Sequence, residues 1–397
     1  MKLKNICIMG TLRSGKTLVS RALNIHPYIS VQVEPYFFFF KICRNIFYRD
    51  ILKDDIDPES PISSGFANFS GYTNLFNEKF NNLQFKDSNI KELIKKTTWQ
   101  QEHEDCKRAP LIIPMLHSLR PGSAKEVLNK LMKILAVSYQ KENLQYIGIS
   151  EGWCDEFIAP LTTDLHYKCI HIIRDPRAII ASRNYGLNIN EKYGGKYPIL
   201  FLIRHWRKSV SYSILNKNNP NYLSIRYEDI VENPKYWFDL ICKHLDVYFD
   251  ENILRPDKYI NGCNNFWKQN TSFKVESGFS TSAINRWESV LSKEDVSLIE
   301  YLCKPEMHYY KYINKFEDCN ISNIASYKEN SNDIVDWLKQ YNLYITEDEI
   351  KKEIMRLQLL DLPVDYVSDS TKKSYFYDDC VYDDLLGLNN NNMQEHL

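Results

Sequence analysis

The residues from Gly10 to Thr17, which read GTLRSGKT, are the first in the chain whose types and spacing indicate a particular chemistry. An apolar run precedes them, and an apolar-periodic segment begins at Leu18. This order predicts a strand, a tight loop and a helix, whose first turn offers N–H groups and the positive end of a dipole. Arg13 and Lys16 add positive charge, so we expect an anion site. Read literally, the loop fits the G-x-x-x-x-G-K-[ST] pattern of nucleotide-triphosphate loops.

A second stretch, from Lys168 to Arg183, has the same order of apolar run, polar turn and helical segment. Asp175 and Pro176 suit the cap and the first turn of a helix. Arg174 lies where the strand should end, and Ser182 follows eight residues later, about two helical turns along. An arginine and a hydroxyl in these positions can hold a second anion.

Two anion sites leave two hypotheses open. A kinase or NTPase would use Lys16 and Thr17 on a triphosphate and needs a carboxylate at a second strand end for Mg²⁺. That strand ends instead in Arg174, which repels a metal, and Asp175 suits a helix cap at least as well as a metal site. The pair of sites better fits a nucleotide that carries phosphate groups at two positions on its ribose.

Three motifs in this order resemble the sulfotransferases that use 3′-phosphoadenosine 5′-phosphosulfate (PAPS), particularly the Golgi carbohydrate and protein-tyrosine branches. The motifs are the loop with the later His26-Pro27, the stretch Ile172 to Ser182, and Ile225 to Pro234. The resemblance covers roughly residues 4 to 310. It implies sulfuryl transfer from PAPS to a hydroxyl or amine, with 3′,5′-bisphosphoadenosine (PAP) as the second product and no metal.

The resemblance also implies roles for individual residues. Those expected to bind the nucleotide are Arg13, Ser14, Gly15, Lys16, Thr17 and Leu18 at the 5′-phosphosulfate, and Arg174, Ser182 and Arg286 at the 3′-phosphate. Glu34 is the expected catalytic base, because the protein-tyrosine branch has its glutamate at the end of the second strand. Arg13 and Lys16 would stabilise the charge that develops during transfer. Glu151 is a rival for the base.

Two departures from the family pattern concern charge. The family usually has Ser or Thr where this chain has Lys16. Many relatives carry a lysine before the 3′-phosphate strand, but the comparable stretch here, Gly148 to Cys154, has none. We therefore hypothesise that Lys16 supplies the missing charge.

The composition excludes some classes of function. The 397 residues have a net charge of −1, which argues against a general nucleic-acid-binding protein. The nine histidines show no metal-ligand spacing, and the ten cysteines form no C-x-x-C pair. We expect buried free thiols rather than disulfides.

We find no signal peptide, and the apolar patch from Tyr36 to Phe40 is far too short to span a bilayer. A soluble, cytoplasmic protein is therefore expected.

Strand-like and helical segments alternate along the chain, which predicts an α/β fold. We expect a P-loop-like three-layer fold, in which helices flank a central, mostly parallel sheet, with a mainly helical C-terminal extension. The expected sulfotransferase domain is 1–316, with acceptor-side insertions at about 36–116 and 185–217. The extension is 317–397, with an acidic, Asn-rich, disordered tail.

Several features of the acceptor side stay open at this stage. The apolar run from Ala109 to Leu116 is predicted to be a buried strand. The basic segment from Arg204 to Lys208 is either a solvated helix face or a binding site for anionic glycans. A glycan or small metabolite is the favoured acceptor, and the sequence does not indicate the oligomeric state.

Overall fold

The structure is a computed structural model that describes residues 3–62, 72–187, 194–267, 278–316, 324, 327, 329–341 and 346–387. Its central sheet contains five strands in the order β2-β5-β1-β6-β7, and all neighbouring strands are parallel. These strands are β1 (Lys4–Met9), β2 (Ile29–Val33), β5 (Tyr146–Ser150), β6 (Lys168–Ile173) and β7 (Tyr222–Arg226). The short strands β3 (Gln84–Phe85) and β4 (Gly122–Ser123) form a separate antiparallel pair.

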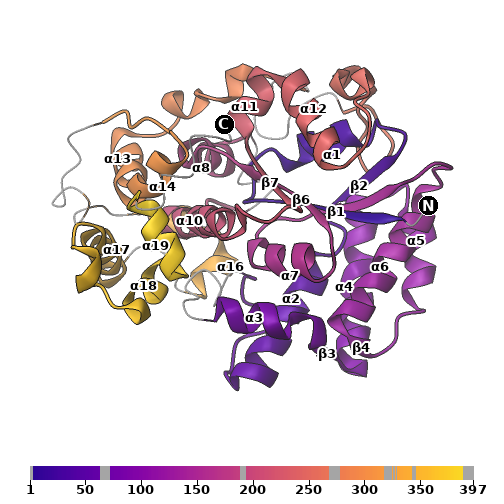
Figure 1. Cartoon of the computed structure of the whole chain (residues 1–397), viewed down its shortest axis with the longest axis horizontal. Helices are drawn as coiled ribbons and strands as arrows, with labels where there is room; N and C mark the ends of the chain where they lie inside the picture. The colour runs from indigo at the N-terminus through magenta and orange to yellow at the C-terminus, as the bar shows by residue number, and fades with distance from the viewer. Residues whose placement is uncertain are drawn as a thin grey trace.

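Helices cover both faces of the sheet (Figure 1). Alternate residues of β1 contact different layers, as the pleat of a strand requires. Ile6 and Ile8 join the core on one face, with helices α1 (Lys16–Leu23), α11 (Tyr227–Glu232) and α12 (Pro234–His244). Cys7 and Met9 join the core on the other face, with α2 (Phe37–Ile46), α6 (Ala124–Tyr139) and α7 (Ile158–Thr163). The predicted α/β fold with three layers is confirmed.

The strand order places the loops that could bind a ligand along one edge of the sheet. β1 is central, between β5 on one side and β6 on the other. In open parallel sheets, ligands bind at the carboxyl ends of the strands, where the strand order changes direction. The segments after β1, β2, β5 and β6 meet at this edge, and they contain the residues singled out from the sequence.

The structure also describes further α-helices. They are α3 (Thr73–Lys79), α4 (Asp87–Glu104), α5 (Ala109–Leu116), α8 (Pro176–Asn184), α10 (Ile199–Asn216), α13 (Lys293–Leu302), α14 (Lys304–Tyr309), α16 (Asp336–Lys339), α17 (Glu347–Leu360), α18 (Asp369–Phe376) and α19 (Asp379–Leu385). A π-helical turn, Phe47–Leu52, extends α2. Residues 388–397, which include the Asn-rich tail, lie outside the described residues.

The strand predicted at Ala109–Leu116 is wrong, because this segment is helix α5. Its buried residues are Ala109, Ile112 and Leu116, whereas Leu111 is 40% exposed. The spacing i, i+3 and i+7 is helical. Pro110 lies in the first turn, where a missing N–H costs nothing. An eight-residue apolar run is compatible with both structures; Pro110 suits the first turn of a helix, whereas Pro114 lies inside it.

The expectation that disulfides are absent is also wrong. Cys106 and Cys263, which are 157 residues apart in sequence, form a disulfide with a Cα–Cα distance of 4.8 Å. Backbone pairing beside it, from Lys107 N to Gly262 O at 3.2 Å, brings the two segments together. The sequence offers no local signal for a contact between such distant segments. The other described cysteines are free, and all of them except Cys380 are buried.

The basic segment of α10 does not form a solvated face, nor does it offer its cations to an acceptor. Arg207 pairs with Glu353 of α17 at 2.5 Å, and Lys208 pairs with Glu156 at 2.7 Å. Arg204 also contacts Glu353, at 2.6 Å. The pairs of Arg204 and Arg207 with Glu353 attach α17 to α10. The C-terminal helices therefore pack against the α/β core, and the division at residues 316 and 317 stays a prediction.

Glu353 should contribute to stability in a pH-dependent way. Burial raises its pKa, but Arg207 and Arg204 overcome that effect and lower the pKa to about 2. Because the folded pKa lies below the unfolded one, this stability is present above the usual glutamate pKa and is lost as pH falls toward 2. We expect Glu353→Gln to lower the free energy of unfolding by about 3 kcal/mol at pH 7.

Urea denaturation at several pH values tests this expectation. The deficit of Glu353→Gln should shrink between about pH 4.3 and pH 2, since the wild type then loses the same stabilisation. Glu347→Gln, on the exposed first turn of the same helix, is the matched control and should change little. An equal effect of the two variants would show that the ion pairs do not hold α17.

Candidate active site

The loop between β1 and α1 leaves the start of α1 open to an anion. In the described part of the chain no side chain caps this helix, and its first turn contains no acidic residue. Gly15 is the N-cap, with φ 101°. The hydroxyl of Ser14 is buried and has no hydrogen-bond partner among the described residues. These features fit a phosphate or sulfonate group, which would accept hydrogen bonds from such donors.

Lys16 is buried inside this loop. Its ammonium donates to Thr11 O at 2.6 Å and to Gly10 O at 3.1 Å. Burial lowers the pKa of Lys16, and the nearby carboxylate of Glu34 is the strongest of the influences that raise it.

Thr17 is half-buried at the next position of α1. Leu18 packs in the core, and its backbone N–H donates to Gly15 O at 3.0 Å, so its predicted binding role would have to use other atoms.

The Arg13 side chain reaches the second predicted site. Its Nε donates to Ser182 Oγ at 3.2 Å. Arg174 Nη1 donates to the backbone oxygen of Arg13 at 2.9 Å, and Arg174 Nε is buried without a partner in the described residues. The structure thus brings together three residues that the sequence had assigned to the two ends of the nucleotide. In this arrangement Arg13 lies beside the residues that were predicted to bind the 3′-phosphate.

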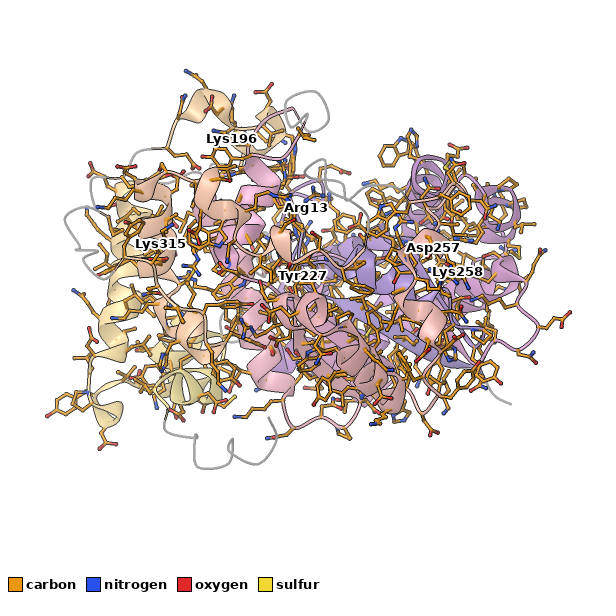
Figure 2. All side chains as sticks on the ribbon, turned by 90° about the horizontal axis from the view of Figure 1, so that it is seen from above. Arg13, Lys196, Tyr227, Asp257, Lys258 and Lys315 are labelled. Atoms are coloured by element: carbon orange, nitrogen blue, oxygen red, sulfur yellow. A yellow bond between two sulfur atoms is a disulfide. The ribbon has the colours of Figure 1, made fainter. Side chains whose placement is uncertain are left out.

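Tyr227 joins the two halves of the site. The Arg174 guanidinium lies 4.4 Å from the centroid of its ring. The same ring covers Gly15, where a Cβ atom would come within 2.3 Å of it. In Figure 2 the labels of Arg13 and Tyr227 both fall near the centre of the molecule. A glycine is required at this position, because the loop backbone directly contacts the tyrosine.

Arg286 lies close enough to this group to affect it. Burial lowers the pKa of Arg286, and the charge of Arg174 lowers it further. Arg286 Nη2 donates to Ser282 Oγ at 3.2 Å, and Arg174 Nη2 donates to the neighbouring Ala283 O at 2.9 Å. Mutual repulsion between the arginines would be relieved by an anion. Residues 268–277 lie outside the described residues.

Glu34 and Lys16 meet beside Gly152. A Cβ atom on Gly152 would lie 3.6 Å from Glu34 Oε1 and 3.7 Å from Lys16 Nζ. Glu34 is half-buried, whereas Glu151 is completely buried. Burial raises the pKa of Glu151 well above its usual range, and the charge of Glu34 adds to this effect. Of these two predicted bases, Glu34 is the one with exposed surface.

Asp175 does not have the free carboxylate that a Mg²⁺ site would use. It caps α8 by accepting from Arg177 N at 2.8 Å, as predicted. The Arg177 guanidinium also holds both carboxylate oxygens, with Nη2 at 2.6 Å from Oδ2. Within the described ranges, no three His, Cys, Asp or Glu residues are grouped so that they could hold a metal ion. The carboxylate that the NTPase hypothesis requires is therefore already used in a structural contact.

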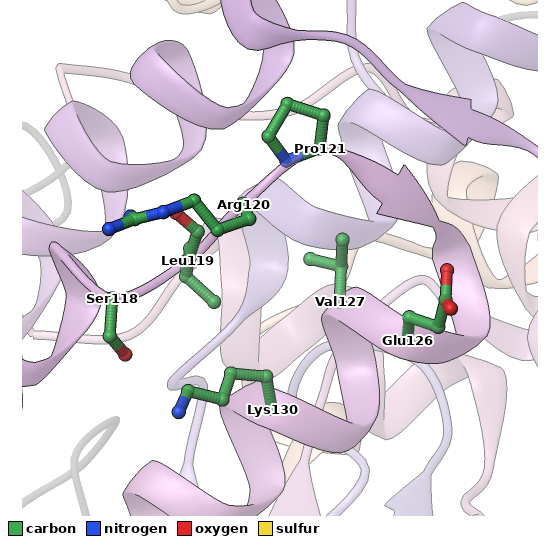
Figure 3. A pocket seen from close by; sticks show the side chains of 7 residues that line it. All are labelled: Ser118, Leu119, Arg120, Pro121, Glu126, Val127 and Lys130. Carbon is green, nitrogen blue, oxygen red and sulfur yellow. The ribbon is translucent and has the colours of Figure 1, made fainter.

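A surface hollow elsewhere contains none of the predicted site residues (Figure 3). It lies where the chain leaves α5 and enters α6, and its lining comprises Ser118, Leu119, Arg120, Pro121, Glu126, Val127 and Lys130. Glu126 is already engaged there, because it accepts a hydrogen bond from Ser123 N at 2.8 Å as part of the cap of α6.

Among the helices that the structure describes, none is both long and apolar enough to cross a membrane.

Comparison with known families identifies the second half of this site. Residues 155–311 match the model of the sulfotransferase domain. This part of the chain is similar to sulfotransferase domains. The matched region contains Arg174, Ser182 and Arg286. It begins after the phosphate loop and Glu34, which therefore lie outside it. The family resemblance deduced from the motifs is thus confirmed.

Solved structures of two sulfotransferase domains and of a retinol dehydratase also align with this chain. The sulfotransferase domain from the curacin biosynthetic pathway is 16% identical, with 77% of this chain and 99% of that one covered and a TM-score of 0.43. The sulfotransferase domain of the Synechococcus PCC 7002 olefin synthase is 17% identical, with 76% and 96% covered and a TM-score of 0.38. Retinol dehydratase, in complex with androsterone and PAP, is 13% identical, with 77% and 82% covered and a TM-score of 0.36. No curated protein matches the chain.

Sequence reasoning missed some residues of the site and gave others no role. Tyr227 and Glu228 lie within the third motif, but their contacts could not be deduced from it. Glu228 accepts from Asp175 N at 3.0 Å and thereby supports the turn that carries Arg174. Gln100 and Gln101, which contact the turn at Glu34, lie in a helix more than sixty residues away and gave no signal.

Gly15→Ala should damage the phosphate loop for two separable reasons. The positive φ is unfavourable for alanine, and the new Cβ would collide with Tyr227. We expect the free energy of unfolding to fall by about 1–3 kcal/mol, measured by urea denaturation. In a Tyr227→Ala background the collision is absent, so the cost of Gly15→Ala should be smaller. An equal cost in both backgrounds would exclude the contact with Tyr227 as a cause.

Proposed function

We propose that this chain transfers the sulfuryl group of PAPS to a hydroxyl or amine of a small-molecule or glycan acceptor. The observation that supports this most is the presence of two cationic sites on either side of the phosphate loop. One contains Lys16 and the open start of α1, and the other contains Arg13, Arg174 and Ser182. PAPS carries a phosphosulfate and a 3′-phosphate at separate positions of its ribose, and it supplies the sulfuryl group. The family match supports the same reaction class.

The chemistry proposed for the protein is mainly positioning and charge stabilisation. Glu34 accepts the proton of the acceptor as the acceptor atom forms its bond to sulfur, while the bond from sulfur to the 5′-phosphate oxygen breaks. Lys16 stabilises the negative charge that develops on that oxygen. Arg13, Arg174 and Arg286 hold the 3′-phosphate. We thus shift Arg13 from the sulfuryl group to the 3′-phosphate, because its side chain lies against Ser182.

Nucleotide binding distinguishes this proposal from the kinase alternative. We expect PAP to raise the melting temperature without any added metal, by an amount that grows with its concentration. Arg174→Met and Ser182→Ala should weaken PAP binding at least tenfold by calorimetry, since each removes contacts to the 3′-phosphate. The proposal fails if PAP does not bind, and stabilisation by ATP only in the presence of Mg²⁺ would favour a kinase.

Turnover tests the roles of Glu34 and Lys16. We expect Glu34→Gln to lower kcat by about 10²–10⁴-fold and Lys16→Ala to lower it by about 10²–10³-fold. The Glu34→Gln variant should largely retain its affinity for PAP. The assay follows transfer of ³⁵S from PAPS to p-nitrophenol, a steroid alcohol, a primary amine and a hexosamine. Glu251→Gln and Lys258→Ala, both exposed, are the matched controls. Full turnover of Lys16→Ala would rule out its proposed role.

A further inference from the structure

The turn that carries Glu34 has a backbone conformation that few residues adopt. Glu34 follows β2 with φ 48°, in the left-handed region, and Pro35 and Tyr36 lead directly into α2. For a residue with a side chain this conformation costs about 1 kcal/mol or more, and it persists only where the surroundings hold it. The structure shows how it is held.

Every residue of this turn has a backbone group bound by a buried side chain. Gln100 Nε2 donates to Glu34 O, and Gln101 Nε2 donates to Pro35 O at 3.2 Å. Tyr36 N donates to Glu151 Oε1 at 2.8 Å. One backbone contact completes the set, because Glu34 N donates to the last residue of β5 at 2.8 Å. The turn is therefore fixed from two sides, by α4 and by the end of β5.

The two glutamines are themselves fixed. Gln100 and Gln101 are only 6% and 1% exposed. The side-chain oxygen of Gln101 accepts from Gln32 Nε2 at 2.8 Å, which orients its amide so that the nitrogen faces Pro35. Gln32 belongs to β2, the strand that ends at this turn. The chain thus uses a strand and a neighbouring helix to define where Glu34 lies.

Glu151 has the properties of a support rather than of a base. It has no exposed surface, and one of its oxygens is occupied by the amide of Tyr36. The other oxygen, Oε2, is buried without a partner in the described part of the chain. The raised pKa of Glu151 favours the neutral carboxylic acid, which still accepts a hydrogen bond from an amide. A neutral acid beside Glu34 also avoids a repulsive pair of charges.

We infer that Glu151, Gln100 and Gln101 are positioning residues that hold the Glu34 turn in the geometry needed for proton transfer. Glu151 acts in this role through the hydrogen bond that it accepts, and it is not the base. The inference rests on the proposed function in so far as Glu34 is taken as the proton acceptor. The sequence left open whether Glu151 is the base, and the inference gives it a supporting role instead.

Two substitutions of Glu151 separate a hydrogen-bond acceptor from a proton acceptor. Glu151→Gln keeps an oxygen for Tyr36 N and should preserve kcat within about threefold. Glu151→Leu removes the oxygen and should lower kcat about 10–100-fold, because a small misplacement of a catalytic group has a large effect on rate. PAP affinity should change less than threefold in both variants, since neither contacts the nucleotide sites.

Gln101→Met provides a second variant on a different element, in case Glu151→Leu does not fold. It should lower kcat about tenfold at unchanged PAP affinity. Gln358→Met, on the exposed face of α17, is the matched control. Hydrogen exchange of the Tyr36 amide gives a readout that is independent of turnover. Its protection should persist in Glu151→Gln and decrease at least tenfold in Glu151→Leu.

The outcomes distinguish this inference from the proposed function. If Glu151→Gln loses as much turnover as Glu34→Gln, Glu151 is the base and the inference is wrong. Unchanged protection of the Tyr36 amide in Glu151→Leu would also overturn it. If PAP does not bind to the wild type, the proposed function fails, whereas the exchange experiment still decides whether Glu151 holds the turn.

Discussion

The burial of one ammonium group, that of Lys16, sets the conditions for the rest of the site. A cation with 6% exposure is costly unless nearby groups compensate its lost hydration. The loop compensates with the carbonyl oxygens of Gly10 and Thr11, which are turned toward the lysine. The remaining compensation comes mainly from the carboxylates of Glu34 and Asp155. The shape of the phosphate loop and the placement of Glu34 are therefore linked through the same side chain.

The opposite side of the loop is organised by stacking and by shared hydrogen bonds. Arg174 lies on Tyr227, and Tyr227 lies on Gly15, so the second cationic site is built directly against the backbone of the first. Arg13 connects the two, because its carbonyl binds Arg174 while its side chain reaches Ser182. A ligand with two anionic groups would thus contact one continuous structure rather than two separate patches.

Local sequence patterns predicted the parts of the fold that depend on near neighbours. The strands before the phosphate loop and before Arg174, the cap at Asp175 and the helix after it were identifiable, because each depends on periodicity or on a side chain two residues away. Contacts between distant segments were not. The Cys106–Cys263 disulfide and the ion pairs of α10 with α17 depend on how the chain returns to itself. The helix at Ala109–Leu116 was missed because a short apolar run has no unambiguous period.

The same distinction applies to the site. Residues that bind anions could be named from the sequence, since glycines, cations and hydroxyls follow strand ends in a regular way. Residues that support them could not, because glutamines in a helix resemble any polar surface. The supporting contacts of Gln100 and Gln101 became apparent only when α4 was placed beside the turn.

The strand order has a consequence for how the protein forms. β1, which leads into the phosphate loop, pairs only with strands made much later, as in the pairs Lys4 with Tyr146 and Ile6 with Lys168. Pairing between segments so far apart in sequence makes folding slow, since a long loop must close before the contacts form. During synthesis the first strand has no neighbour in the sheet until β5 has emerged. The phosphate loop is thus made well before the strand that leads into it can pair.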